Sequence, residues 1–101
     1  MQAKLINSDG RAVIQLQGRF DFNAHRDFRS AYEPLIENVE THSIRIDLGG
    51  VDYLDSSALG MLLMLRDKAA AMKKPLDLAN AQASVKQVLE IANFGKLFRI
   101  V

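Results

Sequence analysis

The sequence lacks cysteine altogether, which excludes disulfide bonds, thiolate metal sites and a cysteine nucleophile. Long hydrophobic runs are also missing. The longest nearly unbroken apolar stretch is Ala58–Leu65, far shorter than the roughly 20 residues that span a bilayer. The N-terminus has no apolar segment of the kind found in signal peptides. These absences predict a soluble, cytoplasmic protein in a reducing compartment.

An excess of charge of one sign is missing too. The 13 Lys and Arg residues oppose 12 Asp and Glu residues, giving a net charge of +1, so neither nucleic acid nor a membrane is expected as a partner. The only histidines are His25 and His42, and no paired metal-ligand spacing or glycine-rich phosphate loop occurs. No nucleophile, base and orienting group can be assembled. We therefore expect no metal, no cofactor and no enzymatic activity.

The composition itself is that of a globular protein, with 49% hydrophobic and 25% charged residues among 101. A chain of this size buries about 65% of its unfolded surface, which is enough for a hydrophobic core without covalent staples. We expect one domain over residues 1–101. Nothing in the sequence demands more than a monomer.

The pattern of apolar residues predicts an α/β fold. Asp9-Gly10 is a strong turn signal between the first two predicted strands. A hairpin followed by helical crossovers implies a mixed β-sheet covered by α-helices, in the order β-β-α-β-α-β-α-β. Strands are expected at Ala3–Asn7, Ala12–Gly18, Ser43–Leu48, Leu76–Leu78 and Leu97–Val101, and helices at 24–39, 56–72 and 85–92.

Several local features add detail to this prediction. Asn23 is a natural N-cap for the first helix, whose apolar stripe extends to Val39. Pro34 lies inside that pattern and predicts a kink or an early end. Gly49-Gly50 is expected to end the third strand and to open a loop over Val51–Asp55.

The segment Leu54-Asp55-Ser56-Ser57-Ala58-Leu59-Gly60 leads from that loop into the most apolar helix. Asp and Ser before an apolar run are what any helix start contains, so capping alone explains much of it. Capping does not explain Gly60, because glycine in a helix costs about 1 kcal/mol relative to alanine. Gly60 suggests close approach by a neighbouring backbone or a partner. Met61, one turn inside the helix, remains open between core filling and a partner surface.

A serine at this helix start is suited to phosphorylation. Free N–H groups and the helix dipole would stabilise a phosphoryl group there, so the fold should tolerate it. With Asp55, and with Asp21 if it lies nearby, the added charge would create a strongly negative patch. A loss of about 3 kcal/mol at an interface weakens binding roughly 150-fold, which is sufficient for a switch.

The motif Asp55-Ser56-Ser57-Ala58-Leu59-Gly60 resembles the Asp-Ser-Ser-Gly/Ala-Leu-Gly motif of bacterial anti-sigma factor antagonists, the STAS-domain family. The resemblance extends over nearly the whole chain. Gly18-Arg19-Phe20-Asp21 is similar to the family's entry to its first helix, and residues 84–98 to its last helix and closing strand. Ala58, Phe20 and Phe22-Asn23 depart from the usual residues, and the changes around Asp21 could alter partner choice.

The resemblance implies a STAS fold and a partner switch. The unphosphorylated antagonist binds an anti-sigma factor that is also a serine kinase with a histidine-kinase-like ATPase fold, and this releases the client. The kinase phosphorylates the second serine of the motif, here Ser57, with Ser56 as the alternative, and a PP2C-type phosphatase reverses the modification. The expected partner-binding surface consists of Asp21, Asn23, Asp55, Ser56, Ser57, Ala58 and Met61.

Two other functions remain open from the sequence. One is a regulatory or scaffold STAS subunit of a transporter or a stress-signalling complex, without phosphorylation control. The other is a nucleotide-binding STAS module, which the missing glycine-rich loop disfavours. The retained pair Ser56-Ser57 favours the switch.

Overall fold

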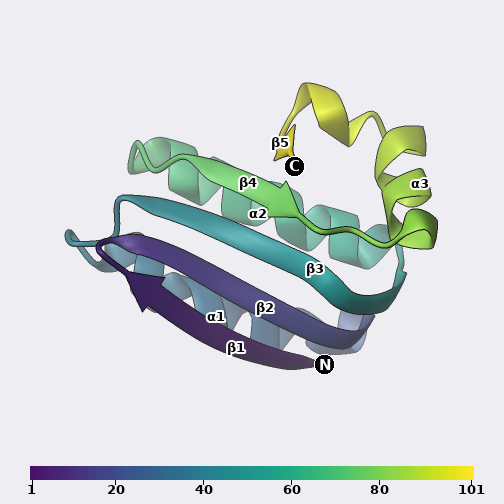
Figure 1. Cartoon of the computed structure of the whole chain (residues 1–101), viewed down its shortest axis with the longest axis horizontal. Coiled ribbons are helices and arrows are strands. Elements are labelled where there is room, and N and C mark those ends of the chain that lie inside the picture. The colour runs from purple at the N-terminus through teal and green to yellow at the C-terminus, as the bar shows by residue number, and fades with distance from the viewer.

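The computed structural model describes all residues 1–101 and contains one five-stranded mixed sheet with the strand order β1-β2-β3-β4-β5 (Figure 1). The predicted order of elements and the α/β fold class are confirmed. β1 pairs antiparallel with β2, and all later pairs are parallel. The elements are β1 (Gln2–Ser8), β2 (Arg11–Phe20), the 3₁₀ turn η1 (Phe22–Ala24), α1 (His25–Glu37), β3 (Ser43–Leu54), α2 (Ser56–Ala71), β4 (Leu76–Ala79), α3 (Ala83–Ile91), the 3₁₀ turn η2 (Phe94–Lys96) and β5 (Arg99–Ile100).

The predicted hairpin forms around a two-residue turn. Asp9 and Gly10 both have positive φ angles, 52° and 82°, which is the geometry of the tight turns that match strand twist. Along β2, Ile14 and Leu16 are fully buried, whereas the next residue, Gln17, is exposed to solvent. This alternation gives the sheet one apolar face and one polar face.

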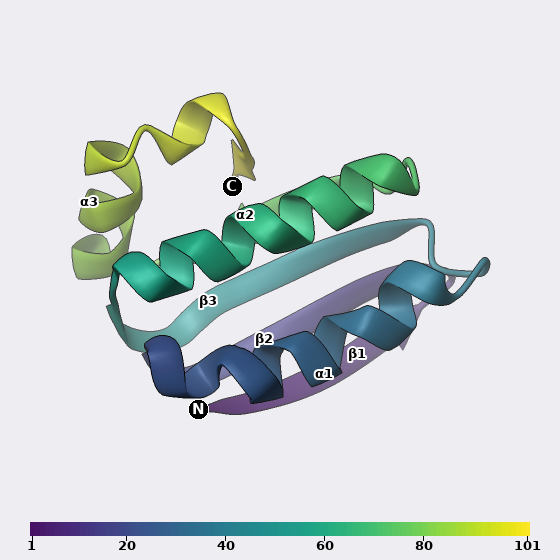
Figure 2. The same cartoon turned by 180° about the vertical axis from the view of Figure 1, so that it is seen from behind.

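The apolar face of the sheet is covered by α1 and α2, which lie side by side (Figure 2). Their buried stripes meet residues of the central strands β2 and β3 in one core. The third helix, α3, lies beyond the carboxyl end of β3 and β4, and buries Val85 and Leu89 there (Figures 1 and 2). No helix of this fold is long and apolar enough to cross a membrane.

β3 does not end at Gly49-Gly50, so the predicted loop over Val51–Asp55 is wrong. The strand continues to Leu54 and contains two bulges, because β2 and β3 shift register after Gln15 and again after Gly18. Gly50 is needed for a close approach of two strands rather than for a turn. A Cβ atom at Gly50 would lie 2.7 Å from the Leu16 carbonyl oxygen.

The first helix also differs from the prediction at its end. Pro34 is accommodated inside α1, and the helix continues three residues further to Glu37. Val39 is therefore outside the helix and 86% exposed, not part of its apolar stripe. The buried Lys74 ammonium donates to the backbone carbonyls of Leu35 (2.8 Å) and Asn38 (2.6 Å). This cation provides a hydrogen-bond donor for carbonyl groups at the C-terminal end of α1, whose own last turn has no basic residue.

The last strand is shorter than predicted. Only Arg99–Ile100 pair with β4, whereas Leu97–Val101 were expected to be extended. The turn η2 precedes it, and the rings of Phe94 and Phe98 stack at 5.1 Å and bury each other. Because Phe98 packs on Phe94, it does not join the strand that the apolar pattern predicted for it.

Candidate functional site

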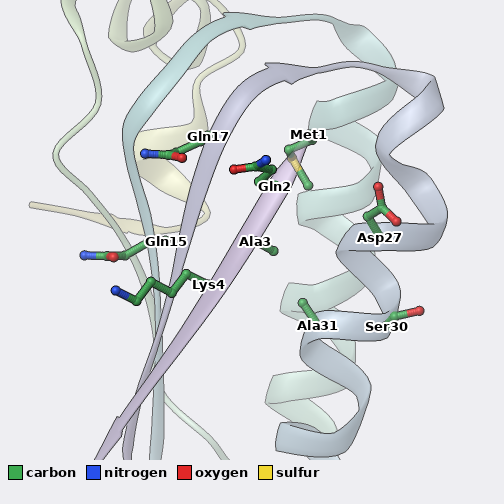
Figure 3. Close-up of a pocket in the computed structure, with 9 residues that line it drawn as sticks. All are labelled: Met1, Gln2, Ala3, Lys4, Gln15, Gln17, Asp27, Ser30 and Ala31. Carbon is green, nitrogen blue, oxygen red and sulfur yellow. The ribbon is translucent and has the colours of Figure 1, made fainter.

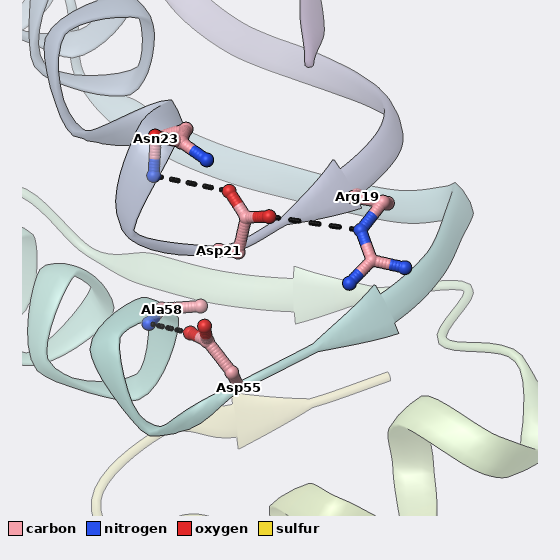
Figure 4. Close-up of polar contacts among 5 residues, drawn as sticks. All are labelled: Arg19, Asp21, Asn23, Asp55 and Ala58. Carbon is pink, nitrogen blue, oxygen red and sulfur yellow. Dashed lines mark hydrogen bonds and ion pairs between the residues drawn. The ribbon is translucent and has the colours of Figure 1, made fainter.

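The site is built where two parallel strands end next to each other. Phe20 at the end of β2 pairs with Leu54 at the end of β3, and the Asp55 N–H donates to the Phe20 carbonyl (3.3 Å). Each strand is followed at once by an aspartate, Asp21 or Asp55. Consequently the two helical segments η1–α1 and α2 begin side by side at the carboxyl edge of the sheet (Figure 4).

Asp21 caps the first of these starts. Its Oδ1 accepts the Asn23 N–H (3.0 Å), and its Oδ2 lies 3.6 Å from Nε of Arg19. The Arg19 guanidinium in turn lies over the ring of Tyr53, 4.1 Å from its centroid. The prediction that Asn23 is the N-cap is wrong, because the chain first makes the short turn η1 and Asp21 caps that turn. Asn23 is exposed beside it.

Asp55 caps α2, as the Asp-Ser-Ser pattern predicted. Its Oδ1 accepts the Ala58 N–H (3.0 Å), and its carbonyl accepts the Leu59 N–H (3.2 Å). Ser56 and Ser57 occupy the first two positions of the helix and are both exposed. Their N–H groups are among those that have no partner inside a helix. The motif therefore presents two hydroxyl groups at a helix N-terminus that faces solvent.

The two serines lie on different sides of α2. Residues about two or three helical turns apart lie on one face, so Ser57 shares its face with Met64 and Lys68, seven and eleven residues along. Lys68 Nζ lies 3.5 Å from Glu33 of α1, and Met64 lines a crease between α1 and α2 together with His25. Ser57 is therefore on the α1 side. Ser56 lies on the other side of α2, which it shares with Leu59 and Leu63. Arg66 follows on that side, and its guanidinium donates to the Leu97 carbonyl.

Two residues of the expected partner surface are buried, which corrects the prediction. Ala58 is completely inaccessible and Met61 is 6% exposed. Both point into the core, because they share the inner face of α2 with Leu62 and Leu65. Within α2 the exposed methionine is Met64, one turn further along and 43% exposed, and Met72 at the C-cap of the helix is 50% exposed. The sequence alone did not separate these methionines, because α2 is apolar on most sides.

Gly60 lies on the exposed side of the first turns of α2. A Cβ atom built there would have no neighbour within 4 Å. The expectation that a neighbouring backbone approaches Gly60 is therefore wrong. The remaining explanation from the sequence is close approach by a partner.

Residues that sequence reasoning did not assign to the site also surround it. Phe22 is 66% exposed and Tyr53 is 41% exposed, so apolar surface borders both aspartates. Arg19 was not expected to contact Asp21. The contact between Arg19 and Tyr53 follows from their pairing across β2 and β3, and that pairing depends on the bulges. A sequence gives no signal for such a register.

The electrostatics of the site differ from a simple acidic patch. The Asp21 carboxylate is paired with Arg19, and both aspartates accept backbone N–H groups. The neighbouring helix pair is bridged by Glu33, which accepts from Arg29 and pairs with Lys68. The hydrogen bond from Arg29 holds the pKa of Glu33 below its ordinary value. Nowhere in the structure do three His, Asp or Glu side chains gather as a metal site would require.

Comparisons with known proteins agree with this geometry. The sequence model of the family described as "Mlab, STAS domain" matches residues 5–101. The STAS-domain containing protein PA14_20770 of Pseudomonas aeruginosa (strain UCBPP-PA14) is 48% identical over 97 residues, which are 95% of this chain and 94% of that protein.

Solved structures share the fold at lower identity. The anti-sigma factor antagonist SpoIIAA of Bacillus, in its unphosphorylated form, superposes with a TM-score of 0.82 at 21% identity, covering 99% of this chain and 88% of SpoIIAA. Its phosphorylated form gives a TM-score of 0.75 at 20% identity, covering 99% and 91%. A sulfate transporter family protein from Wolinella succinogenes gives 0.80 at 12% identity, covering 94% and 79%. The same fold therefore occurs in proteins of different roles.

Proposed function

The chain belongs to the STAS-domain family, and we propose that it is an anti-sigma factor antagonist that acts as a phosphorylation-controlled partner switch. In its unphosphorylated form it binds an anti-sigma factor that is also a serine kinase, and the client of that factor is released. Phosphorylation of Ser57 ends the complex. Because the kinase uses ATP, the switch operates in the bacterial cytoplasm.

The observation that carries this proposal is the position of Ser57. It is exposed in the first turn of α2, one residue before the N–H that Asp55 caps. A phosphoryl group on Ser57 would meet unpaired N–H groups and the positive end of the helix dipole. The modification is therefore compatible with the folded domain, and its effect falls on the surface.

A phosphoryl group would change that surface from nearly neutral to strongly negative. It adds a charge of about −2 close to Asp55. The Arg19 guanidinium is already shared between Asp21 and the Tyr53 ring, so we expect it to neutralise only part of the new charge. The exposed apolar side chains of Phe22 and Met64 would lose a partner that packs on them. Repulsion and bulk act together without any change of fold.

The proposed partners come from the resemblance to anti-sigma factor antagonists. The kinase has a histidine-kinase-like ATPase fold, a PP2C-type phosphatase restores the unphosphorylated form, and this chain contributes no catalytic residue of its own. SpoIIAA, which has the same fold, is known in an unphosphorylated and a phosphorylated form, which supports the proposal.

The test is a measurement of intact mass. The protein is incubated with ATP and an extract of its own cells, beside the variants Ser57→Ala and Ser56→Ala. We expect a gain of one phosphoryl group in wild type and in Ser56→Ala, and no gain in Ser57→Ala. A gain in Ser57→Ala but not in Ser56→Ala would move the site to the other face of α2. No gain in any sample, with the kinase shown to be active on another substrate, would contradict the switch.

A second candidate function has its own observation. The sulfate transporter family protein from Wolinella succinogenes connects this fold with transport proteins. In that case the chain is a regulatory subunit without phosphorylation control, and the same surface binds permanently. Its complex would then resist substitution of Ser57 by aspartate, whereas a switch would not.

A further inference from the structure

One edge of the sheet is left open. β1 forms that edge, and all seven of its residues, Gln2–Ser8, are exposed (Figure 1). It contains no proline and no bulge, and Lys4 is its only charged residue. The opposite edge is protected by its shortness, because β5 has only two residues. A long, regular edge strand presents unpaired backbone groups to other strands.

The hairpin turn determines which backbone groups of β1 are unpaired. In a two-residue hairpin the residues that flank the turn, here Ser8 and Arg11, form a hydrogen-bonded pair. Hydrogen-bonded and non-bonded pairs alternate along antiparallel strands. Gln2, Lys4, Ile6 and Ser8 therefore bond to β2. The N–H and C=O groups of Ala3, Leu5 and Asn7 point to the open edge.

We propose that this edge pairs with β1 of a second copy of the chain, antiparallel and centred on Leu5. In this register Leu5 lies opposite Leu5, and Ala3 lies opposite Asn7. Each of these pairs joins outward-facing N–H and C=O groups, so each exchanges two backbone hydrogen bonds. Two sheets then become one continuous sheet around a two-fold axis. This is a closed, symmetric arrangement of the kind that most homodimers use.

Side chains on both faces fit the same register. On the polar face, Lys4 lies opposite Ile6 of the second copy, so no like charges are directly opposed. On the helix face, the two Leu5 side chains meet, and each of them is 51% exposed in the single chain. Leu5 and Ile6 thus gain cover on opposite faces of the sheet.

A hollow of about 760 Å³ borders β1, and its lining includes Ala3, Asp27 and Ser30 as well as Gln15 and Gln17 of β2 (Figure 3). Ala3 is small and points toward α1, whereas Gln2 and Lys4 lie on the other side of the strand (Figure 3). The residue opposite Ala3 is Asn7 of the second copy. In this register its amide would lie on the face of the sheet that α1 covers.

The pairing leaves the proposed switch free. Because the two β1 strands run in opposite directions, the carboxyl edges of the two sheets lie at opposite ends of the dimer. Each copy keeps its own Ser57 and its own α2 start exposed. The dimer is therefore independent of the proposed phosphorylation, and either inference can fail without the other.

The absence of native cysteine allows a test of the register by disulfide formation. Leu5→Cys places two thiols directly opposite each other, within the Cα separation that a disulfide accepts. Lys4→Cys alone, and Ile6→Cys alone, place them diagonally, about 7–8 Å apart and beyond that range. A mixture of Lys4→Cys and Ile6→Cys again brings them opposite. We expect cross-linked dimer from Leu5→Cys and from the mixture, and little from either of the other two variants alone.

A measurement on the protein without cysteine completes the test. Sedimentation should show a species of twice 11.3 kDa that grows with concentration. Leu5→Pro removes an outward N–H without touching the β1–β2 ladder, so it should abolish that species and keep the thermal unfolding transition. Equal cross-linking of all three single variants would overturn the register. A constant mass of one chain at every concentration would overturn the dimer.

Discussion

The two ends of the α1–α2 layer are held by opposite kinds of contact. At the carboxyl edge of the sheet the side-chain hydrogen bonds that cap the two helix starts are local: Asp21 reaches two residues along the chain and Asp55 reaches three. At the other end Lys74 reaches back 36 and 39 residues to the carbonyls at the end of α1. Arg45 and Asp77 similarly join β3 to β4 with two hydrogen bonds.

This difference separates stability from recognition. Long-range contacts at the Lys74 end tie elements together, so changes there should act on folding. Local caps at the other end fix only the first turns of the helices, and they leave Ser56, Ser57 and Gly60 exposed. Changes in those exposed residues should act on binding with little effect on the fold.

The largest effect is expected on binding. Ser57→Asp places a charge at the proposed docking surface and should weaken binding to the kinase by about 3 kcal/mol, roughly 150-fold. Thermal unfolding should change little, because the residue is exposed. Calorimetric titration with the purified kinase measures the difference. Ser56→Asp, on the other side of α2, is the matched control and should weaken binding less. Equal affinity of Ser57→Asp and wild type would remove the switch.

At the opposite end the expected effect is on stability. Lys74→Met keeps the length of the side chain but leaves the Leu35 and Asn38 carbonyls without their donor, which should lower the free energy of unfolding by about 2 kcal/mol. Urea denaturation measures this change. Lys73→Met alters the exposed neighbour and should shift the same quantity by less than about 0.5 kcal/mol. If both variants behave alike, Lys74 does not brace α1.

A smaller loss of stability is expected at the cap of α2. Asp55→Ala removes the acceptor of the Ala58 N–H and should lower the free energy of unfolding by about 1 kcal/mol. Asp55→Asn keeps an acceptor oxygen at the same place, so it should retain most of that stability. Thermal unfolding of the two variants side by side decides the point. An equal loss in both would show that charge, and not the cap, stabilises this turn.

Gly60→Ala should change stability and binding to the kinase in opposite directions. The new methyl group meets no atom within 4 Å, and alanine favours a helix over glycine by about 1 kcal/mol, so stability should rise. Binding to the kinase should weaken, because the proposed partner approaches this bare backbone. Urea denaturation and titration on the same sample give both values. A stabilised variant with unchanged affinity would place Gly60 outside the docking surface.

The smallest effect concerns pH. The hydrogen bond from Arg29 lowers the pKa of Glu33 from its ordinary value of 4.5, so the folded state favours the ionised carboxylate. Its contribution to stability is present above pH 4.5 and is lost as the pH falls through the lowered pKa. Glu33→Gln should therefore lose less stability on acidification than wild type. Unfolding in urea at neutral and acid pH measures this difference, with Glu37→Gln on the same helix as the control.

The sequence predicted the course of the chain well where local rules decide it. Asp9-Gly10 set the hairpin, and the Asp-Ser-Ser pattern set the start of α2. It failed where a distant segment decides the conformation. Gly49-Gly50 looks like the end of a strand, but Gly50 is required by the nearby Leu16 carbonyl on β2. The cap at Asp21 was missed because a 3₁₀ turn precedes α1.

The site was predicted in part for the same reason. Asp55, Ser56 and Ser57 are contiguous in the chain, so their placement together at one helix start followed from the sequence. The burial of Ala58 and Met61 depends on which side of an almost uniformly apolar helix meets the sheet. The contact of Arg19 with Asp21 and Tyr53 depends on two bulges. Neither this burial nor these contacts of Arg19 can be predicted from a pattern in a single sequence.

The bulges of β3 have a kinetic consequence. By carrying the strand to Leu54, they fix the start of α2 to the end of β2 through a backbone hydrogen bond. A partner that docks there meets a surface that is already ordered, so association loses little conformational entropy. In the proposed switch, a phosphoryl group would then act mainly on how fast the complex dissociates. The response time of the system would be set by the turnover of kinase and phosphatase, with no slow rearrangement of this chain between them.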